Sequence, residues 1–277
     1  TLELFTSHPV IAAFTGMLVT ILLQSSSTTT VMIVGFVNAG LMNLQQALGT
    51  IMGANIGTTI TAQMVSFNLQ DVALPAIGIG FLVSFLARKR LHRYLGQSLL
   101  GFGLLFLVMS TMSQALVPLR DYAPFVQGLI NLGRHPWLGV LVGALFTMVI
   151  QSSSATTGLV IVLTMQDLIT LDAGLGLVLG ANIGTSITAV LAGIGANVTA
   201  RRAAMAHVLF NLIGVLVFLP FLGPFTRLVR ATSTIPARQI ANAHTMFNII
   251  NTLLFLPFIS PFAALLARVV PGEEVIL

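Results

Sequence analysis

Residues 24–30 read Gln-Ser-Ser-Ser-Thr-Thr-Thr, a run of uncharged polar side chains set between two strongly apolar stretches. Residues 151–157 repeat the run as Gln-Ser-Ser-Ser-Ala-Thr-Thr, 127 positions later. At this spacing, residues 8–62 align without a gap to residues 135–189, with 24 identities among 55 pairs. The chain therefore contains an internal duplication, and each copy is polar where its surroundings are apolar.

A second polar motif follows each copy at the same distance. Residues 53–58 and 180–185 both read Gly-Ala-Asn-Ile-Gly-Thr, inside segments that are otherwise apolar. Polar clusters within a membrane are costly, so such clusters favour a functional site.

The composition is that of a membrane protein. Of 277 residues, 56% are hydrophobic and 7% charged, and the mean hydropathy is +0.99. Soluble domains carry about 25% charged residues. One helical crossing needs about 20 apolar residues, so the chain can supply roughly six to ten membrane elements. The net charge of +5 is small and excludes a nucleic-acid partner, while the absence of cysteine excludes disulfides and thiolate metal sites.

The order of apolar and polar segments predicts the topology of the chain. Each polar run sits between two apolar arms too short to span, which predicts a re-entrant helical hairpin, or a broken helix, with the polar run at the break. The expected elements are, in order, a hairpin over 8–38, a broken span over 47–67, spans over 72–87 and 95–117, a connector over 118–134 with a surface helix, a hairpin over 136–165, a broken span over 173–194, a span over 203–222, and a stretch over 240–269 broken by Pro257 and Pro261.

Three spans follow the first hairpin, an odd number, so the second copy starts from the opposite membrane face. The sequence thus predicts an all-α polytopic membrane protein with two inverted-topology repeats, each with a re-entrant hairpin and a broken transmembrane helix. We expect one transport domain over 1–277, with repeat one over 8–117, repeat two over 135–270 and the connector over 118–134. The basic cluster at 88–93, with Arg201, Arg202 and Arg268, is expected inside, and Arg227, Arg230 and Arg238 outside.

Broken helices expose the groups that ions need. Half-helix N-termini present free N–H groups and a positive dipole end to an anion, and carbonyl, hydroxyl and amide oxygens suit Na⁺. Neither polar motif contains Arg or Lys, so co-bound cations are the natural counter-charge for an anion. The pattern favours cation-coupled anion transport.

Several of these residues also have structural interpretations. Glycines four residues apart, as at 53 and 57, are the small-residue pattern of helix packing. Ala-His-x-x-Phe-Asn occurs at 206–211 and again at 243–248, and we favour hydrogen-bonded packing over ligand or proton handling for both copies. Asp167 and Asp172 are expected in the connector at the membrane surface, with a cation site at Asp167 as the minority interpretation.

At the duplicated motifs the sequence resembles the type II sodium–phosphate cotransporter family in its bacterial form. The resemblance rests on residues 24–27, 151–154, 53–59 and 180–186, with the two Ala-His-x-x-Phe-Asn stretches, and covers nearly the whole chain. It implies symport of inorganic phosphate with Na⁺ by alternating access in a bacterial inner membrane.

The resemblance also implies site residues. Those expected to bind phosphate are Ser25, Ser26, Ser27, Asn55, Thr58, Ser152, Ser153, Ser154, Asn182 and Thr185. Those expected to bind sodium are Gln24, Thr28, Thr59, Gln151, Ser152, Thr156, Thr185, Ser186 and Thr188. Na⁺ is the one expected cofactor, as a co-transported ion, and no other metal or organic cofactor is expected.

Alternatives remain open at this point. They are Na⁺-coupled transport of another small anion such as a carboxylate or sulfate, a passive anion channel, and a membrane phosphate sensor. An enzyme is not expected, because no nucleophile, base and acid can be assembled from the motifs. Besides phosphate, Na⁺ and the lipid bilayer, we hypothesise a homodimer and a soluble regulatory domain beyond residue 277.

Overall fold

The computed structural model describes residues 5–67 and 69–272, and all regular secondary structure in those ranges is helical, with no strand. The elements in order are α1 (Pro9–Leu23), α2 (Ser26–Asn38), α3 (Leu44–Val65), α4 (Gln70–Leu86), α5 (Arg90–Leu116), η2 (Val117–Asp121), α6 (Ala123–Arg134), α7 (Pro136–Ile150), α8 (Ser153–Met165), α9 (Leu171–Gly184), α10 (Ile187–Ala192), α11 (Val198–Phe218), η3 (Leu219–Phe221), α12 (Leu222–Ala231), α13 (Pro236–Phe255), η4 (Leu256–Phe258) and α14 (Ile259–Val269). This confirms the all-α class.

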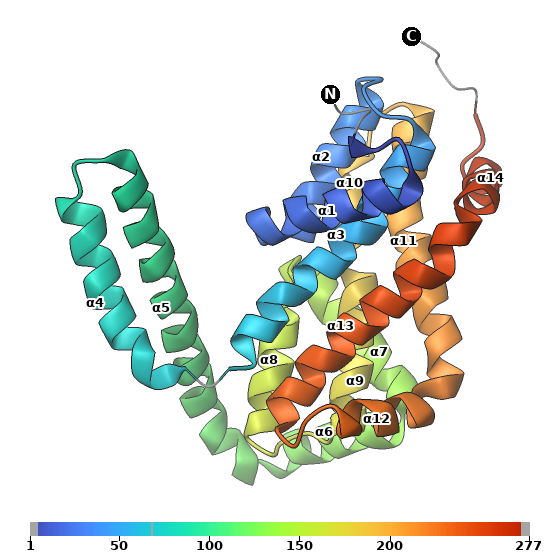
Figure 1. Ribbon diagram of the computed structural model, residues 1–277. Coiled ribbons are helices and arrows are strands. Elements are labelled where there is room, and N and C mark those ends of the chain that lie inside the picture. Colours follow the sequence, from blue (N-terminus) through green and yellow to red (C-terminus); the bar gives the residue numbers. More distant parts are fainter. Residues whose placement is uncertain (1–4, 68, 273–277) are drawn as a thin grey trace.

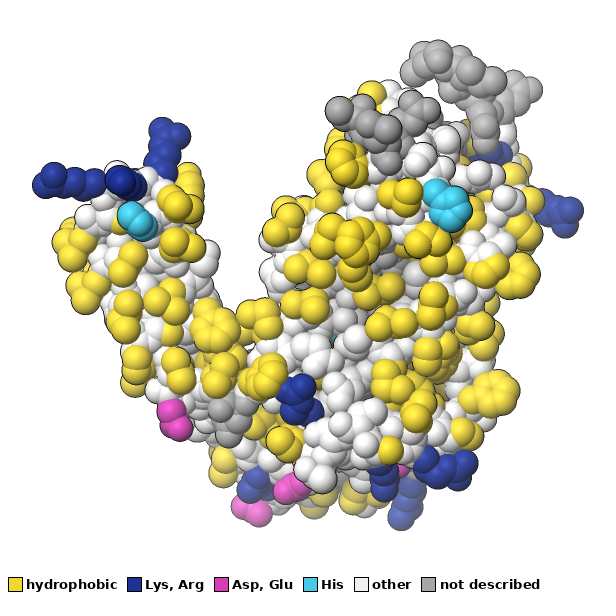
Figure 2. Space-filling model, viewed as in Figure 1, with side chains coloured by type: hydrophobic (Ala, Val, Ile, Leu, Met, Phe, Trp, Pro, Cys, Tyr) yellow, Lys and Arg dark blue, Asp and Glu magenta, His cyan; other side chains and the backbone are white. Residues whose placement is uncertain are grey.

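Within the described residues, four helical stretches are long and apolar enough to cross a membrane, and the count rises to six if each sharply bent helix pair is one span. The four stretches are Arg90–Asp121, Leu171–Ala192, Val198–Ala231 and Pro236–Val269. Large apolar side chains cover much of the outer surface (Figure 2). In a membrane protein such side chains face lipid, so a multi-pass membrane protein is confirmed.

The two copies form the two ends of the main body. Helix α1 packs along α3, and α7 packs along α9 in the same way. In Figure 1 the first hairpin, α1–α2, lies at the upper end of the body and the second, α7–α8, at the lower end. This arrangement fits the inverted repeat. Helices α4 and α5 pack on each other as an arm that projects from the body, while the C-terminal half of α5 packs on α8.

A second duplication lies in the C-terminal part. Residues 198–231 and 235–268 align at a spacing of 37, with 16 identities among 34 pairs. Helix α11 packs on α2 and α3 of the first copy, whereas α13 packs on α8 and α9 of the second and also on α3. The two helices run in opposite directions (Figure 1). Each hairpin therefore has its own partner helix from the C-terminal duplication.

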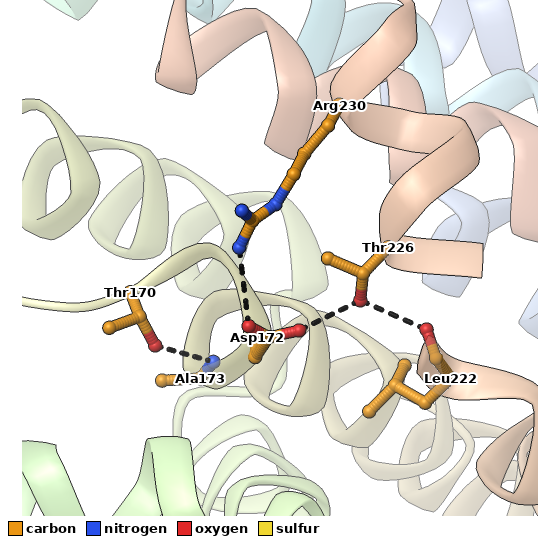
Figure 3. Close-up of polar contacts among 6 residues, drawn as sticks. All are labelled: Thr170, Asp172, Ala173, Leu222, Thr226 and Arg230. Atoms are coloured by element: carbon orange, nitrogen blue, oxygen red, sulfur yellow. Dashed lines mark hydrogen bonds and ion pairs between the residues drawn. The ribbon is translucent and has the colours of Figure 1, made fainter. Parts of the chain in front are cut away.

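Helix α12 was not expected as a separate element, and one carboxylate holds it in place. The carboxylate of Asp172, in the first turn of α9, accepts a hydrogen bond from Thr226 Oγ1 at 2.9 Å and pairs with Arg230 at 3.4 Å (Figure 3). Both partners lie on α12. The pair is exposed, so we assign it a positioning role and little net stability. Asp167 lies in the loop before α9 with φ +54°.

The predicted break in the first copy is wrong in its position. Residues 53–58 lie within the continuous helix α3 (Leu44–Val65), and the bend of 104° comes between that helix and Gln70–Leu86. In the second copy two turn residues, 185 and 186, separate α9 from α10 at the end of the motif, inside the single apolar stretch Leu171–Ala192.

Candidate functional site

Each hairpin turns at a glutamine followed by a serine. Gln24 and Gln151 are in the left-handed conformation, with φ +55° and +59°, which is uncommon for a residue other than glycine. Ser25 begins α2 by accepting a hydrogen bond from the N–H of Thr28 at 3.1 Å. Ser152 begins α8 in the same way, accepting from the N–H of residue 155 at 3.2 Å. Both tips therefore end one half-helix and present the N-terminus of the next.

The two tips also share a buried pair of threonines, one pair in each hairpin. Thr20 and Thr29 join α1 to α2 through their hydroxyls at 2.9 Å. Thr147 and Thr156 join α7 to α8 at 2.7 Å. Because its hydroxyl is used in this pair and in a bond to the carbonyl of residue 152, Thr156 is placed in the hairpin's internal packing.

A cavity of about 720 Å³ gathers side chains from both hairpin tips. Ser25, Ser27 and Thr28 of the first tip line it together with Gln151 of the second and Thr188 of α10. Ser27 Oγ also lies 3.3 Å from Thr185 Oγ1, so the first tip contacts the break of the second copy. Ser26 and Ser153 are both 4% exposed and turn into the packing.

A second cavity, of about 410 Å³, is related to the first by the duplication. It is lined by Ser152, Ser154 and Thr61, which stand 127 positions from Ser25, Ser27 and Thr188. Its remaining wall is apolar and comes largely from α5 and α8. At the first tip, Gln24 Oε1 accepts a hydrogen bond from Thr61 at 2.8 Å. Each hairpin thus has one cavity of the same origin beside its serines.

No charged side chain lines either cavity. Among the described residues there is also no group of three or more His, Asp or Glu that could hold a metal ion. The sites offer hydroxyls, amides and backbone groups only. Such neutral oxygen-rich surroundings suit an anion accompanied by small hard cations.

The asparagines of the second motif point away from the cavities toward two buried histidines. Asn55 Oδ1 lies 3.2 Å from His207 Nε2 on α11, and Asn182 Oδ1 lies 3.3 Å from His244 Nε2 on α13. Both asparagines are 2% exposed, and each amide NH₂ donates to a carbonyl one turn earlier, in residues 51 and 178. The histidines therefore fix the asparagines in the packing.

The hydroxyls that follow these asparagines are also engaged. Thr59 Oγ1 donates to the carbonyl of residue 56 at 2.8 Å, and Thr188 Oγ1 donates to that of Thr185 at 2.9 Å. Ser186 Oγ donates to the carbonyl of His207 at 3.2 Å. Thr58 and Thr185 are both buried. Of this group, Thr185 and Thr188 are the residues that reach the first cavity or its serines.

The sequence analysis favoured hydrogen-bonded packing for His207 and His244, but it did not predict that their partners are Asn55 and Asn182. The motif that contains the asparagines repeats at a spacing of 127, and the motif that contains the histidines repeats at a spacing of 37. Two copies of each motif indicate that each asparagine has one histidine as its partner. Which histidine belongs to which asparagine depends on the packing of α11 and α13, which no local pattern encodes.

We expect His207→Phe to lower the stability of the protein by about 1–3 kcal/mol, because Asn55 Oδ1 would lose its donor while staying buried. His207→Gln retains an N–H donor and should lose less. Thermal unfolding in detergent measures both. His92→Phe, on the exposed side of α5, is the control and should leave the melting temperature unchanged. Equal melting temperatures for His207→Phe and the parent protein would contradict the positioning role.

The chain is similar to proteins of one known family over most of its length. A model of the Na⁺/Pi-cotransporter family matches residues 1–114 and 123–255. "Uncharacterized protein YqeW" of Bacillus subtilis is 35% identical over 235 residues, covering 85% of this chain and 76% of that protein. "Putative inorganic phosphate export protein YjbB" of Salmonella typhimurium is 36% identical over 219 residues, covering 79% of this chain and 40% of that protein.

Similarity extends to animal proteins over a shorter part. Human "Sodium-dependent phosphate transport protein 2B" is 41% identical over 92 residues, which is 31% of this chain and 13% of that protein. The chain thus spans less than half the length of the Salmonella and human relatives. No solved structure matches the chain.

Proposed function

The chain belongs to the Na⁺/Pi-cotransporter family, and on that premise we propose that it carries inorganic phosphate across the membrane together with Na⁺ by alternating access. The observation that carries the proposal is the cavity of about 720 Å³ in which side chains of both hairpin tips meet without any charged residue. Alternating access in inverted-repeat transporters works on a site at the junction of the two repeats.

Phosphate binding follows from the helix ends at the tips. The first-turn N–H groups of α2 and α8 have no partner within their helices, and the positive dipole ends favour an anion. We propose that Ser25 and Ser27 of the first tip, and Ser152 and Ser154 of the second, add hydroxyl donors to these amides. Thr185 joins them through its contact with Ser27.

Na⁺ coupling follows from charge balance. A phosphate dianion in a cavity without Arg or Lys lacks a counter-charge, and a buried unpaired charge is costly. We propose that Na⁺ supplies the positive charge and is held by carbonyl, hydroxyl and amide oxygens at the tips and the second-copy break. The candidates are Gln24, Thr28, Gln151, Ser152, Thr185 and Thr188. Asn55 and Asn182 are proposed to shape the site through their helices.

The proposed transport could run in either direction in the cell, as export or as uptake of phosphate. The Salmonella relative is named for phosphate export, and the human relative for sodium-dependent phosphate transport. The same two cavities serve either direction. Because the bacterial relatives cover most of this chain, we propose the inner membrane of a bacterium as its location and no enzymatic activity.

The test is uptake of radiolabelled phosphate into proteoliposomes with and without an inward Na⁺ gradient. We expect uphill uptake that needs Na⁺, and a fall of at least about tenfold in kcat/KM in the double variant Ser27→Ala/Ser154→Ala, because two hydrogen bonds to a charged ligand are lost. Ser98→Ala, on the exposed face of α5, should transport normally.

Two results would count against the proposal. Uptake that is equally fast without a Na⁺ gradient would remove the coupling. Inhibition of phosphate uptake by sulfate or a carboxylate at lower concentration than by unlabelled phosphate would assign another anion as substrate.

A further inference from the structure

Two more cavities lie near the ends of the body, and each contains an arginine. The first, of about 560 Å³, is lined by Ser66 and Phe67 after α3, by Thr164 and Asp167 after the second hairpin, and by Arg238 of α13. The guanidinium carbon of Arg238 stands 4.3 Å from the centre of the Phe67 ring. The side chain is half-buried. Within residues 5–67 and 69–272 it makes no ion pair or hydrogen bond, so its N–H donors are free for a ligand while its face contacts the Phe67 ring.

The other cavity, of about 360 Å³, is lined by Gly193 and Ile194 after α10, by Val270 and by Arg201 of α11. Arg201 is exposed at its edge. In the described part of the chain it too has no ion pair or hydrogen bond. Its neighbour Arg202 differs, because that guanidinium donates to the carbonyls of Val270 and Gly272 and holds the chain after α14.

The two arginine cavities are copies of one another. Ser66 and Phe67 stand 127 positions before Gly193 and Ile194, and Arg238 stands 37 positions after Arg201. Each arginine comes six residues before the histidine that holds a motif asparagine. Both duplications therefore relate the same two cavities. The spacing of 127 relates their loop residues, and the spacing of 37 relates their arginines.

The two cavities open at opposite ends of the molecule. Arg201 lies in the first turn of α11 and Arg238 in the first turn of α13. These helices run in opposite directions, with α11 beginning at the upper end of the body and α13 at the lower end (Figure 1). The two helices therefore place one arginine at each end of the body.

Each arginine cavity also adjoins one of the serine-lined cavities. Thr61 lines the cavity of the second tip, and Ser66 of the Arg238 cavity follows it by five residues. Thr188 lines the cavity of the first tip, and Gly193 of the Arg201 cavity follows it by five residues. Five helical residues advance about 7.5 Å, so each arginine cavity and a serine-lined cavity share a wall about one and a half helical turns long.

We propose that Arg201 and Arg238 are a matched pair of anion-collecting residues, each binding phosphate weakly at one membrane face before it enters the adjoining serine-lined cavity. The inference rests on the proposed function and adds the entry sites to it. The half-buried guanidinium of Arg238 attracts a phosphate dianion more strongly than one in open water, because the local dielectric is lower, although the carboxylate of Asp167 in the same cavity opposes this attraction. The exposed guanidinium of Arg201 attracts the anion through its charge at the edge of its cavity. The serine cavities remain neutral, so the anion passes from a charged entry site to a neutral transport site.

The sidedness of the two arginines gives the test. Phosphate uptake is measured in right-side-out and inverted membrane vesicles for Arg238→Gln and Arg201→Gln. We expect each variant to raise the apparent KM for phosphate about 3- to 10-fold from one face only, with kcat within about twofold, and the two variants to affect opposite faces. Arg238→Lys and Arg201→Lys keep the charge and should restore most of the affinity.

Two exposed arginines are matched controls. Arg227 is carried by α12, which lies at the end of the body where α13 begins, and Arg268 by α14, which lies at the end where α11 begins (Figure 1). Their substitution by Gln removes the same charge from the same face and should leave the KM unchanged. Raising the ionic strength with choline chloride at constant Na⁺ should shrink the difference between the parent protein and the Gln variants.

Lipid phosphate could occupy the same guanidinium groups, and proteoliposomes with and without phosphatidylglycerol distinguish it from free phosphate. An effect of Arg238→Gln that changes with phosphatidylglycerol content and is equal from both faces would assign the arginine to a headgroup and overturn the inference. So would an unchanged KM at both faces in a protein that transports normally. If the parent protein moves no phosphate at all, the proposed function itself fails. That result differs from a lipid-dependent effect and from an unchanged KM, which overturn only the role of the arginines.

Discussion

Replacing Gly53 or Gly180 with alanine is expected to disrupt the fold and abolish transport. A Cβ atom on Gly53 would lie 1.7 Å from the carbonyl oxygen of Ala13, and one on Gly180 would lie 2.1 Å from that of Val140. Both obstacles are backbone atoms, so no side chain can rotate to make room. Overpacking of this kind costs about 1–3 kcal/mol and sometimes more, and we expect at least the upper value.

Thermal unfolding in detergent measures the effect. A loss of about 3 kcal/mol corresponds to a melting temperature lower by about 6–12 °C in a chain of this size. Gly35→Ala on α2 is the matched control, because its Cβ would meet nothing within 4 Å and alanine favours a helix by about 1 kcal/mol. A Gly53→Ala protein that melts with the parent protein would show that α1 and α3 are not in close contact.

The second polar motif illustrates what the sequence can predict and what it cannot. Its glycines had a packing interpretation and its asparagine a functional one, and the two interpretations apply to opposite sides of one helix. Gly53 and Gly57 face α1, whereas Asn55, two residues along and about 200° around the helix, faces α11. The spacing of these residues predicts that the glycines and the asparagine lie on different sides of the helix. It does not predict which helix packs on each side, because α1 and α11 are distant from the motif in sequence.

The position of the helix break could not be predicted from local sequence. Residues 53–58 and 180–185 are identical, yet α3 continues through its copy and α9 ends within its copy. The next residue differs, and Ser186 bonds to the carbonyl of His207 and accepts a hydrogen bond from Asn211 at 3.1 Å. Thr59 bonds within its own helix instead. Tertiary contacts, rather than the motif, decide where the helix opens.

The hairpins, by contrast, follow from the sequence almost completely. Short apolar arms, a polar break and a serine suited to begin a helix are local features, and both tips have the predicted form. The division of the serines was not predictable. Ser25 and Ser27 line the cavity, while Ser26 lies buried between them, because consecutive helical residues point about 100° apart.

Replacing Ser25 with aspartate is expected to abolish phosphate transport while leaving the fold intact. Aspartate begins a helix as well as serine does, so α2 keeps its N-cap. The added negative charge would lie in the cavity where we propose that phosphate binds. At about 4 Å and an effective dielectric constant near 20, each pair of like charges costs about 4 kcal/mol, which corresponds to a loss of at least about 100-fold in kcat/KM. Ser152→Asp should act in the same way at the second tip.

Asparagine at the same position isolates the charge, because Ser25→Asn also preserves the N-cap but adds no charge. Uptake by Ser25→Asn is expected to stay within about tenfold of the parent protein, and all three proteins should melt at similar temperatures. The aspartate variant also separates an anion site from a cation site. If the tip bound Na⁺ alone, an added carboxylate would strengthen that binding, and Na⁺-dependent uptake would be kept or improved at low Na⁺. Loss of transport by aspartate but not by asparagine therefore requires that the substrate near Ser25 be negatively charged.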